Sequence, residues 1–127
     1  MQDPAEIVRS FYEKLGSGDV AGVLGLLAAD IEWTTMWHYK VASPGLVGVV
    51  DGIFKPLMAE WPRHSLVPTE FIVDGDTVVS LGTFTGVHGT TGKEAQARYA
   101  HVWTVRNGQV ARFRQYIDTL AVEEART

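Results

Sequence analysis

The sequence predicts a single α+β domain over residues 1–127, with three helical segments first and an antiparallel meander of strands after them. Apolar residues recur at helical spacing in much of the first half and at every second position in most of the second half. A chain of 127 residues can bury one proper core but not two. Helices and strands do not alternate along the chain, so a parallel sheet is not expected.

Composition narrows the classes of function. A formal net charge of -4 gives no support for nucleic-acid binding, which usually needs a basic face. The absence of cysteine excludes disulfides, thiol catalysis and cysteine-ligated metals. No segment approaches the roughly 18 consecutive apolar residues of a membrane span, and the first ten residues lack the apolar run of a signal peptide. We therefore expect a cytoplasmic protein that binds neither nucleic acid nor a membrane.

Two helices are predicted at the start of the chain. Asp3 can cap the first helix, and Pro4 suits its first helical position. Gly16 and Gly18 end this helix. Asp19 then caps a second helix with apolar residues at helical spacing. The two helices together supply an apolar surface that a sheet can cover.

The rest of the chain predicts one early strand, a third helix and the meander. Residues Ile31–Trp37 alternate as a strand, and Asp51–Trp61 has apolar residues four apart, as in a helix. Pro56 is tolerable only near the first turn of that helix, and Pro62 ends it. The meander strands are predicted at Leu66–Val73, Thr77–Val87, Glu94–Arg106 and Gln109–Asp118.

The pairing of the last two strands decides which side chains share a face. A two-residue turn at Asn107-Gly108 places His101 with Arg112, Arg114, Tyr116 and Asp118. A three-residue turn that includes Arg106 and ends in a glycine bulge gives a different face. That face holds Tyr99, His101, Trp103, Val105, Ala111, Phe113, Gln115 and Ile117. We take the second register, because it separates an apolar face from a charged one.

The order of elements and several short segments resemble the SnoaL-like, ketosteroid-isomerase-related group of the nuclear-transport-factor-2-like superfamily. The segments are Phe11-Tyr12, Gly18-Asp19, Leu26–Trp33, Thr91–Lys93, His101–Gly108 and Phe113–Thr119. The resemblance implies a cone-like (cystatin-like) fold, in which three N-terminal helices pack on a strongly bent antiparallel sheet around a pocket. It also implies a homodimer. The same cone hosts enzymes and non-catalytic binders, so the fold does not settle the function.

Most catalytic residues of characterised relatives are not matched here. Steroid isomerases carry an aspartate and a tyrosine where this chain has Thr35 and Phe11, and Tyr12 points about 100° away from Phe11 on a helix. Epoxide hydrolases of this fold carry an arginine and two aspartates where Gly82, Phe84 and Gln115 stand. SnoaL-type cyclases pair a histidine with an acid fourteen residues later. His101 matches the histidine, whereas Gln115 replaces the acid.

The candidate site follows from these positions. His101 and Asp118 are the candidate catalytic residues, with Asp118 alternatively a helix cap or a salt-bridge partner of Arg112 or Arg114. His38, His64 and His88 lack the spacing of metal ligands, so no metal site and no cofactor is expected. Six residues are candidates for contact with a substrate: Trp33, Thr35, Trp37, Tyr99, Phe113 and Gln115.

Two hypotheses for function follow. The first is a cofactor-independent isomerase or polyketide-cyclase-like enzyme that acts on a hydrophobic carbonyl compound by acid-base chemistry at His101. The second is a non-catalytic domain that binds or senses an apolar small molecule. Gln115 in place of an acid favours the second, while His101 and the tryptophans motivate the first.

Overall fold

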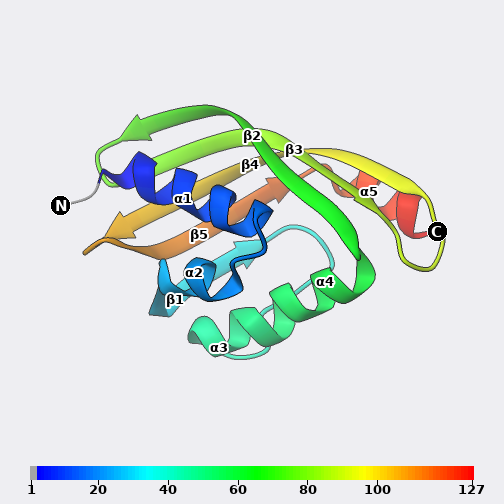
Figure 1. Ribbon diagram of the computed structural model, residues 1–127, viewed down its shortest axis with the longest axis horizontal. Coiled ribbons are helices and arrows are strands. Elements are labelled where there is room, and N and C mark those ends of the chain that lie inside the picture. The colour runs from blue at the N-terminus through cyan, green and yellow to red at the C-terminus, as the bar shows by residue number, and fades with distance from the viewer. Residues whose placement is uncertain (1–2) are drawn as a thin grey trace.

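The computed structural model describes residues 3–127 as a curved five-stranded sheet with helices packed on its concave side (Figure 1). The helical elements are α1 (Pro4–Gly16), α2 (Val20–Gly25), α3 (Gly45–Val49), the π-helical segment η1 (Val50–Phe54), α4 (Lys55–Glu60) and α5 (Thr119–Arg126). The strands are β1 (Leu27–Thr35), β2 (Arg63–Asp74), β3 (Thr77–Val87), β4 (Glu94–Arg106) and β5 (Gln109–Ile117). The α+β order and the cone-like fold predicted from the sequence are confirmed.

The sheet is mixed rather than wholly antiparallel, which corrects one part of the prediction. The strand order is β1-β5-β4-β3-β2, and β1 runs parallel to β5 while the other three pairs are antiparallel. Short hairpin loops force consecutive strands of the meander to be antiparallel. No such loop joins β1 to β5, so their relative direction is set by packing and not by a turn.

The predicted face of the last hairpin is right, but the turn that we expected to produce it is wrong. Asn107 and Gly108 form a two-residue turn with φ angles of 53° and 75°, typical of type I′. The extra residue lies further along, at a β-bulge where Ala111 is skipped between the Val105–Val110 and Thr104–Arg112 pairs. Beyond the bulge, the side chains of Phe113, Gln115 and Ile117 face the helices, as we predicted.

The bulge also corrects one residue of the predicted inner face. Val110 has no exposed surface and takes the inner position that we assigned to Ala111, which is half-buried. On the far side of the bulge, His101 pairs directly with Gln115, and Trp103 pairs with Phe113. The bulge therefore keeps both ends of β5 packed against the core.

The capped N-terminal ends of the first two helices were predicted correctly, whereas the third helix is longer than expected. The Asp3 carboxylate accepts a hydrogen bond from the Ala5 N–H, and the Asp19 carboxylate accepts one from the Gly22 N–H. The third helix begins at Gly45, six residues before the predicted start, so Pro56 lies deep inside a continuous helical run. The wider π-helical turn of η1 comes just before this proline, which lacks an N–H for the helical hydrogen-bond ladder.

The core lies between α1 and the concave face of the sheet. The apolar stripe of α1 is buried, and the Phe11 ring meets the Trp103 ring edge-on at 4.8 Å between centroids. Strand β1 begins at Leu27 and ends at Thr35, so Trp37 lies past its end, although it is still buried. Within residues 3–127, no helix is long and apolar enough to cross a membrane.

Candidate functional site

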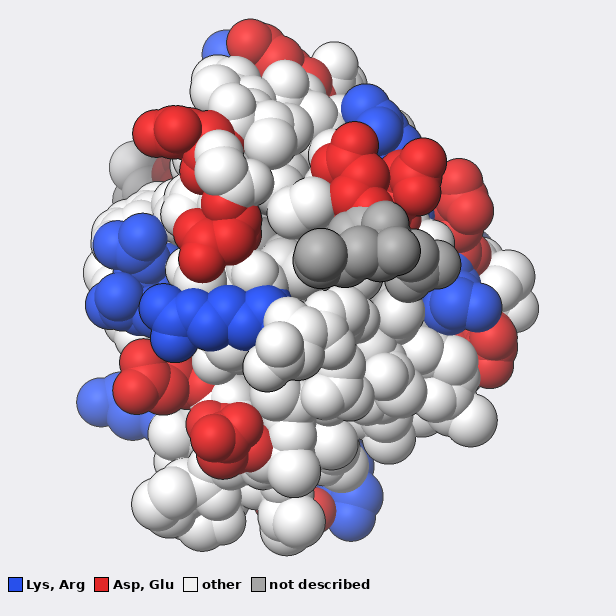
Figure 2. All heavy atoms as spheres, turned by 90° about the vertical axis from the view of Figure 1, so that its left-hand side faces the viewer, with Lys and Arg blue, Asp and Glu red and all other residues white. Residues whose placement is uncertain are grey.

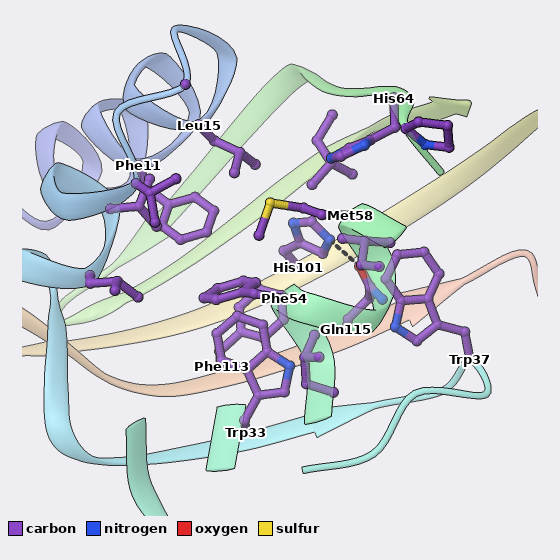
Figure 3. Close-up of a pocket in the computed structure, with 18 of the residues that line it drawn as sticks. Phe11, Leu15, Trp33, Trp37, Phe54, Met58, His64, His101, Phe113 and Gln115 are labelled. Carbon is purple, nitrogen blue, oxygen red and sulfur yellow. Dashed lines mark hydrogen bonds between the residues drawn. The ribbon is translucent and has the colours of Figure 1, made fainter. Parts of the chain in front are cut away.

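A cavity of about 480 Å³ lies between the helices and the concave face of the sheet (Figure 3). Its wall is largely apolar and aromatic, and it is built by α1, α2, the helical run from η1 to α4, and the four strands β1, β2, β4 and β5. Main contributors are Phe11, Leu24, Trp33, Trp37, Ile53 and Phe113. Two buried polar side chains, His101 and Gln115, also line it. An apolar cavity of this size with few polar groups is typical of a small-molecule site.

His101 and Gln115 form the polar end of this cavity. Their positions on β4 and β5 are directly paired, and their side chains are 1% and 3% exposed. The His101 Nε2 and Gln115 Oε1 atoms are 2.7 Å apart, a hydrogen bond drawn as a dashed line in Figure 3. The prediction that these two side chains face the same hollow is thus confirmed by the geometry.

The pair belongs to one row of polar residues that crosses four strands. Ser80 on β3 pairs with His101, His101 pairs with Gln115, and Gln115 pairs with Thr35 on β1. The Gln115 Nε2–H donates to Thr35 Oγ1 at 2.8 Å. We call these four residues the polar row. Each of them is on the inner face of its strand.

Tyr12 of α1 completes the hydrogen bonding of the polar row. Its hydroxyl is 2.5 Å from His101 Nδ1 and 2.7 Å from Ser80 Oγ. The Trp103 indole N–H donates to Ser80 Oγ at 2.8 Å. Both ring nitrogens of His101 are therefore engaged, one by Tyr12 and the other by Gln115. Neither nitrogen offers a free lone pair to a substrate.

Burial keeps His101 and the two tyrosines beside it uncharged. It lowers the pKa of His101 to about 3, and the hydrogen bond with Gln115 opposes this only in part. Burial also raises the pKa of Tyr12 far above its ordinary value and raises the pKa of Tyr99 to about 12. A group that stays neutral at pH 7 can orient a ligand through hydrogen bonds without adding charge to the pocket.

Four of the six predicted contact residues line the cavity: Trp33, Trp37, Phe113 and Gln115. The other two, Thr35 and Tyr99, are not among the residues that line it. Thr35 acts through Gln115, as its hydrogen-bond acceptor. Tyr99 stacks on the His101 ring, with 3.9 Å between centroids and 16° between planes, and so lies beside the histidine.

Asp118 lies outside the cavity. Its side chain is exposed, and its Oδ1 accepts a hydrogen bond from the Ala121 N–H at the start of α5. This is the helix-cap role that the sequence left open. Asp118 is not among the residues that line the cavity, so we do not carry it forward as a catalytic group.

Tyr12 and Ser80 are the site residues that sequence reasoning missed. Tyr12 was set aside because it points away from Phe11, yet that direction leads to His101, while Phe11 lines the cavity. Ser80 carried a usable signal. It is a polar residue at an inner position of β3, between the fully buried Val78 and Phe84. A buried hydroxyl of this kind needs a partner, and its partner was the missing tyrosine.

A second polar cluster holds the elements together near α5. Glu60 at the end of α4 accepts hydrogen bonds from His38, Tyr39, His88 and Arg126, at 2.5–2.8 Å. Burial alone would raise the pKa of Glu60, but these bonds hold it well below its usual range. Within the part of the chain that the structure describes, no His, Asp or Glu group is arranged to hold a metal ion. The cluster ties the loop that carries Trp37 to α4 and α5.

The bent sheet, the helices on its concave side and the apolar cavity between them define a domain of the nuclear-transport-factor-2-like class. Residues 8–113 match the SnoaL-like domain family, and the chain belongs to that family. Among curated proteins, no sequence matches this chain.

Solved structures agree with this assignment. A nuclear-transport-factor-2-like protein from Burkholderia thailandensis E264 is 32% identical, with a TM-score of 0.89 over 100% of this chain and 99% of that one. TerC, crystallized with polyporic acid, is 27% identical, with a TM-score of 0.83 over 96% of both chains. IdmH from Streptomyces antibioticus, for which a polyketide cyclase activity has been suggested, is 19% identical, with a TM-score of 0.83 over 98% of both chains. At that identity, the likeness to IdmH shows the fold alone.

The neutral His101 makes a prediction for stability against pH. In the unfolded chain its pKa is 6.5, and in the folded protein it is about 3. Between these values the unfolded state binds a proton that the folded state does not, so stability is full above pH 6.5 and falls as the pH drops. The expected loss is about 1.4 kcal/mol per pH unit below 6.5.

Urea unfolding at pH 7.5, 6.5 and 5.5 tests this, with His101→Gln as the comparison. The wild-type free energy of unfolding should fall more steeply between pH 6.5 and 5.5 than that of the variant. The Glu60 carboxylate acts in a separate window, because its pKa is 4.5 in the unfolded chain and lower in the folded one. Equal slopes for the two proteins would contradict a neutral, buried His101.

Proposed function

We propose that this protein binds a hydrophobic small molecule that carries a carbonyl group, with the carbonyl oxygen at the polar end of the cavity. The observation that carries the proposal is the largely apolar cavity with one buried, uncharged polar pair, His101 and Gln115. Aromatic side chains such as Trp33 and Phe113 suit a flat ligand body. TerC, whose crystals contain polyporic acid, supports a small organic ligand for this fold.

A second candidate function is acid-base catalysis of the isomerase or polyketide-cyclase type, without a metal or redox cofactor. It is favoured by the place of His101 in the cavity wall, at the position where cyclases of this family hold a histidine. In this candidate the His101 ring would give up one of its two hydrogen bonds, take a proton from the ligand at the freed nitrogen and return it at another position, with a water handling the second transfer. The binding proposal comes first, because both nitrogens of His101 are already engaged.

Solvent deuterium exchange separates the two candidates. The protein is incubated with a small library of enolisable aromatic ketones in D₂O, and incorporation at the carbon beside the carbonyl is followed by NMR. If the protein only binds, ketones should bind by calorimetry without exchange above the buffer rate. Exchange by the wild type that is lost in His101→Ala would establish the catalytic candidate.

The control is Gln96→Ala, which changes an exposed side chain of the same strand that does not line the cavity. Its exchange should equal that of the wild type under either candidate. Failure of every ketone to bind, with the protein folded, would contradict the proposal that this cavity takes a hydrophobic carbonyl compound.

We also propose that the protein forms a homodimer through the outer face of the sheet. On that face, cross-strand pairing aligns Ile72, Val79 and Val102 in one apolar row. On β5 the residue paired with Val102 is Arg114, and Tyr116, 45% exposed, follows two positions later. A two-fold dimer needs one self-complementary patch, and a twisted sheet face with apolar residues can supply it. Elsewhere the surface is mixed: on the face in Figure 2, Lys and Arg side chains lie among Asp and Glu side chains.

Light scattering at micromolar concentration tests the dimer. The expected mass is twice the 14.0 kDa of the chain, and Val102→Arg should reduce it to that of the monomer, because a buried unpaired charge at an interface is costly. Val47→Arg is the matched control, since Val47 is an exposed apolar residue on α3. A wild-type particle of 14.0 kDa would contradict the proposal.

The cytoplasmic location of the protein stays a prediction from the sequence.

A further inference from the structure

The direction of the hydrogen bonds through the polar row can be worked out from Ser80. The Ser80 side chain has no exposed surface, and two groups contact its oxygen: the Trp103 indole and the Tyr12 hydroxyl. An indole N–H can only donate, so the single hydrogen of the serine cannot go to Trp103. Among the described residues, the Tyr12 oxygen is the only side-chain acceptor within reach of that hydrogen.

The direction of each further hydrogen bond in this network then follows. Tyr12 accepts from Ser80 and donates its own hydrogen to His101 Nδ1. A neutral imidazole that accepts at Nδ1 carries its proton on Nε2, and this N–H donates to Gln115 Oε1. In the reverse direction His101 Nδ1 would donate to Tyr12. Either the Ser80 hydrogen or, if Tyr12 accepts from both neighbours, the Tyr12 hydrogen would then be buried without an acceptor, which is unfavourable.

The direction of the chain decides what Gln115 offers to a ligand. Its carbonyl oxygen is taken by His101, and its amide nitrogen, which carries two hydrogens, gives only one of them to Thr35. Figure 3 shows the oxygen of this amide turned toward His101 and its nitrogen on the other side. The polar end of the cavity therefore presents a donor.

The neighbouring wall has the same character. The indole nitrogens of Trp33 and Trp37 are buried and have no hydrogen-bond partner in residues 3–127. Both tryptophans line the cavity, and both are N–H donors that cannot accept. One acceptor lies further out: His64 donates from Nδ1 to the Trp61 carbonyl, which leaves its Nε2 lone pair free when the ring is neutral.

We infer that Ser80 is a positioning residue that fixes the His101 tautomer and the Gln115 amide, so that the cavity selects ligands with an acceptor oxygen at its polar end and disfavours ligands with a donor there. This inference rests on the proposed function, because it concerns the ligand of the same cavity. It adds the side chain that controls specificity, although Ser80 is not among the residues that line the cavity.

The first test measures the tautomer directly in the protein without ligand. Protein labelled with ¹⁵N-histidine contains four histidines, and the His101 signals are those missing from His101→Gln. The expected result is a proton on Nε2 in the wild type, a mixture of tautomers in Ser80→Ala, and restoration of the Nε2 form in Ser80→Thr, which keeps the hydroxyl. If Ser80→Ala does not fold, Tyr12→Phe replaces it. A wild-type proton on Nδ1 overturns the inference.

The second test compares three flat tricyclic probes of similar size by calorimetry. Fluorenone has only an acceptor, carbazole has only an N–H donor, and fluorene has neither. We expect fluorenone to bind roughly threefold to tenfold more tightly than fluorene, and carbazole no more tightly than fluorene. The preference for fluorenone should disappear in Ser80→Ala and in Gln115→Glu, whose carboxylate can still accept from His101 but offers no N–H. The series is repeated in His64→Phe, because the His64 lone pair could hold carbazole.

The two proposals fail in different ways. Binding of all three probes without a preference, or a preference for carbazole that persists in His64→Phe, overturns the inference together with the placement of a carbonyl oxygen at the polar end. Either result leaves standing the proposal that the cavity binds a hydrophobic small molecule. If no probe binds to the folded protein, the proposed function is contradicted. The tautomer measurement alone then decides whether Ser80 sets the direction of the hydrogen bonds between Tyr12, His101 and Gln115.

Discussion

The polar row of Ser80, His101, Gln115 and Thr35 is the constraint on which the rest of the site depends. These side chains lie on the inner face of the sheet, and Ser80, His101 and Gln115 are almost wholly buried, so most of their hydrogen-bonding atoms must find partners in the protein. Cross-strand pairing brings them side by side, and Tyr12 reaches in from α1 to close the one remaining gap. A row that satisfies itself in this way can line a cavity without taking up charge.

The position of the row depends on a single bulge. Without the extra residue at Ala111, alternation along β5 would turn Gln115 and Phe113 to the outer face and bring the charged Arg112 and Arg114 inward. The bulge thus serves both packing and the site. The Glu60 cluster, in turn, fixes the loop of Trp37, a residue of the cavity wall, against α4.

An amide at position 115 changes what the histidine can do. A carboxylate beside an imidazole stabilises the protonated ring, whereas a neutral amide does little to offset burial. His101 is therefore suited to hold a hydrogen-bond direction more than to take a proton. This is why the binding of a carbonyl compound ranks ahead of catalysis, even though the chain belongs to a family with cyclase-like neighbours.

Much of the fold could be predicted from local signals. Capping at Asp3 and Asp19 and the alternation of the meander strands each have a short-range cause, and they hold in the structure. The place of the last turn also holds, although it has two residues where we took three. The parallel pairing of β1 with β5 has no such local cause, and the prediction missed it.

The site was predictable only in part, for a related reason. Binary patterning was enough to place His101 and Gln115 on one face, although the bulge that does so was assigned to the turn. Contacts between residues far apart in the sequence, in contrast, have no local sequence pattern from which they could be predicted. Tyr12 reaches His101 across 89 positions, and Glu60 gathers His38 and His88 from separate loops. Asp118 looked catalytic by its nearness in sequence, but its local role as a cap prevailed.

The central claim is that burial among uncharged partners keeps residue 101 neutral. An NMR pH titration that follows the ring C–H signals of His101 from pH 8 to pH 5 tests it most directly. The account predicts that these signals keep their shifts over the whole range, because the pKa lies near 3. A titration with a midpoint near the ordinary histidine value of about 6.5 would contradict it.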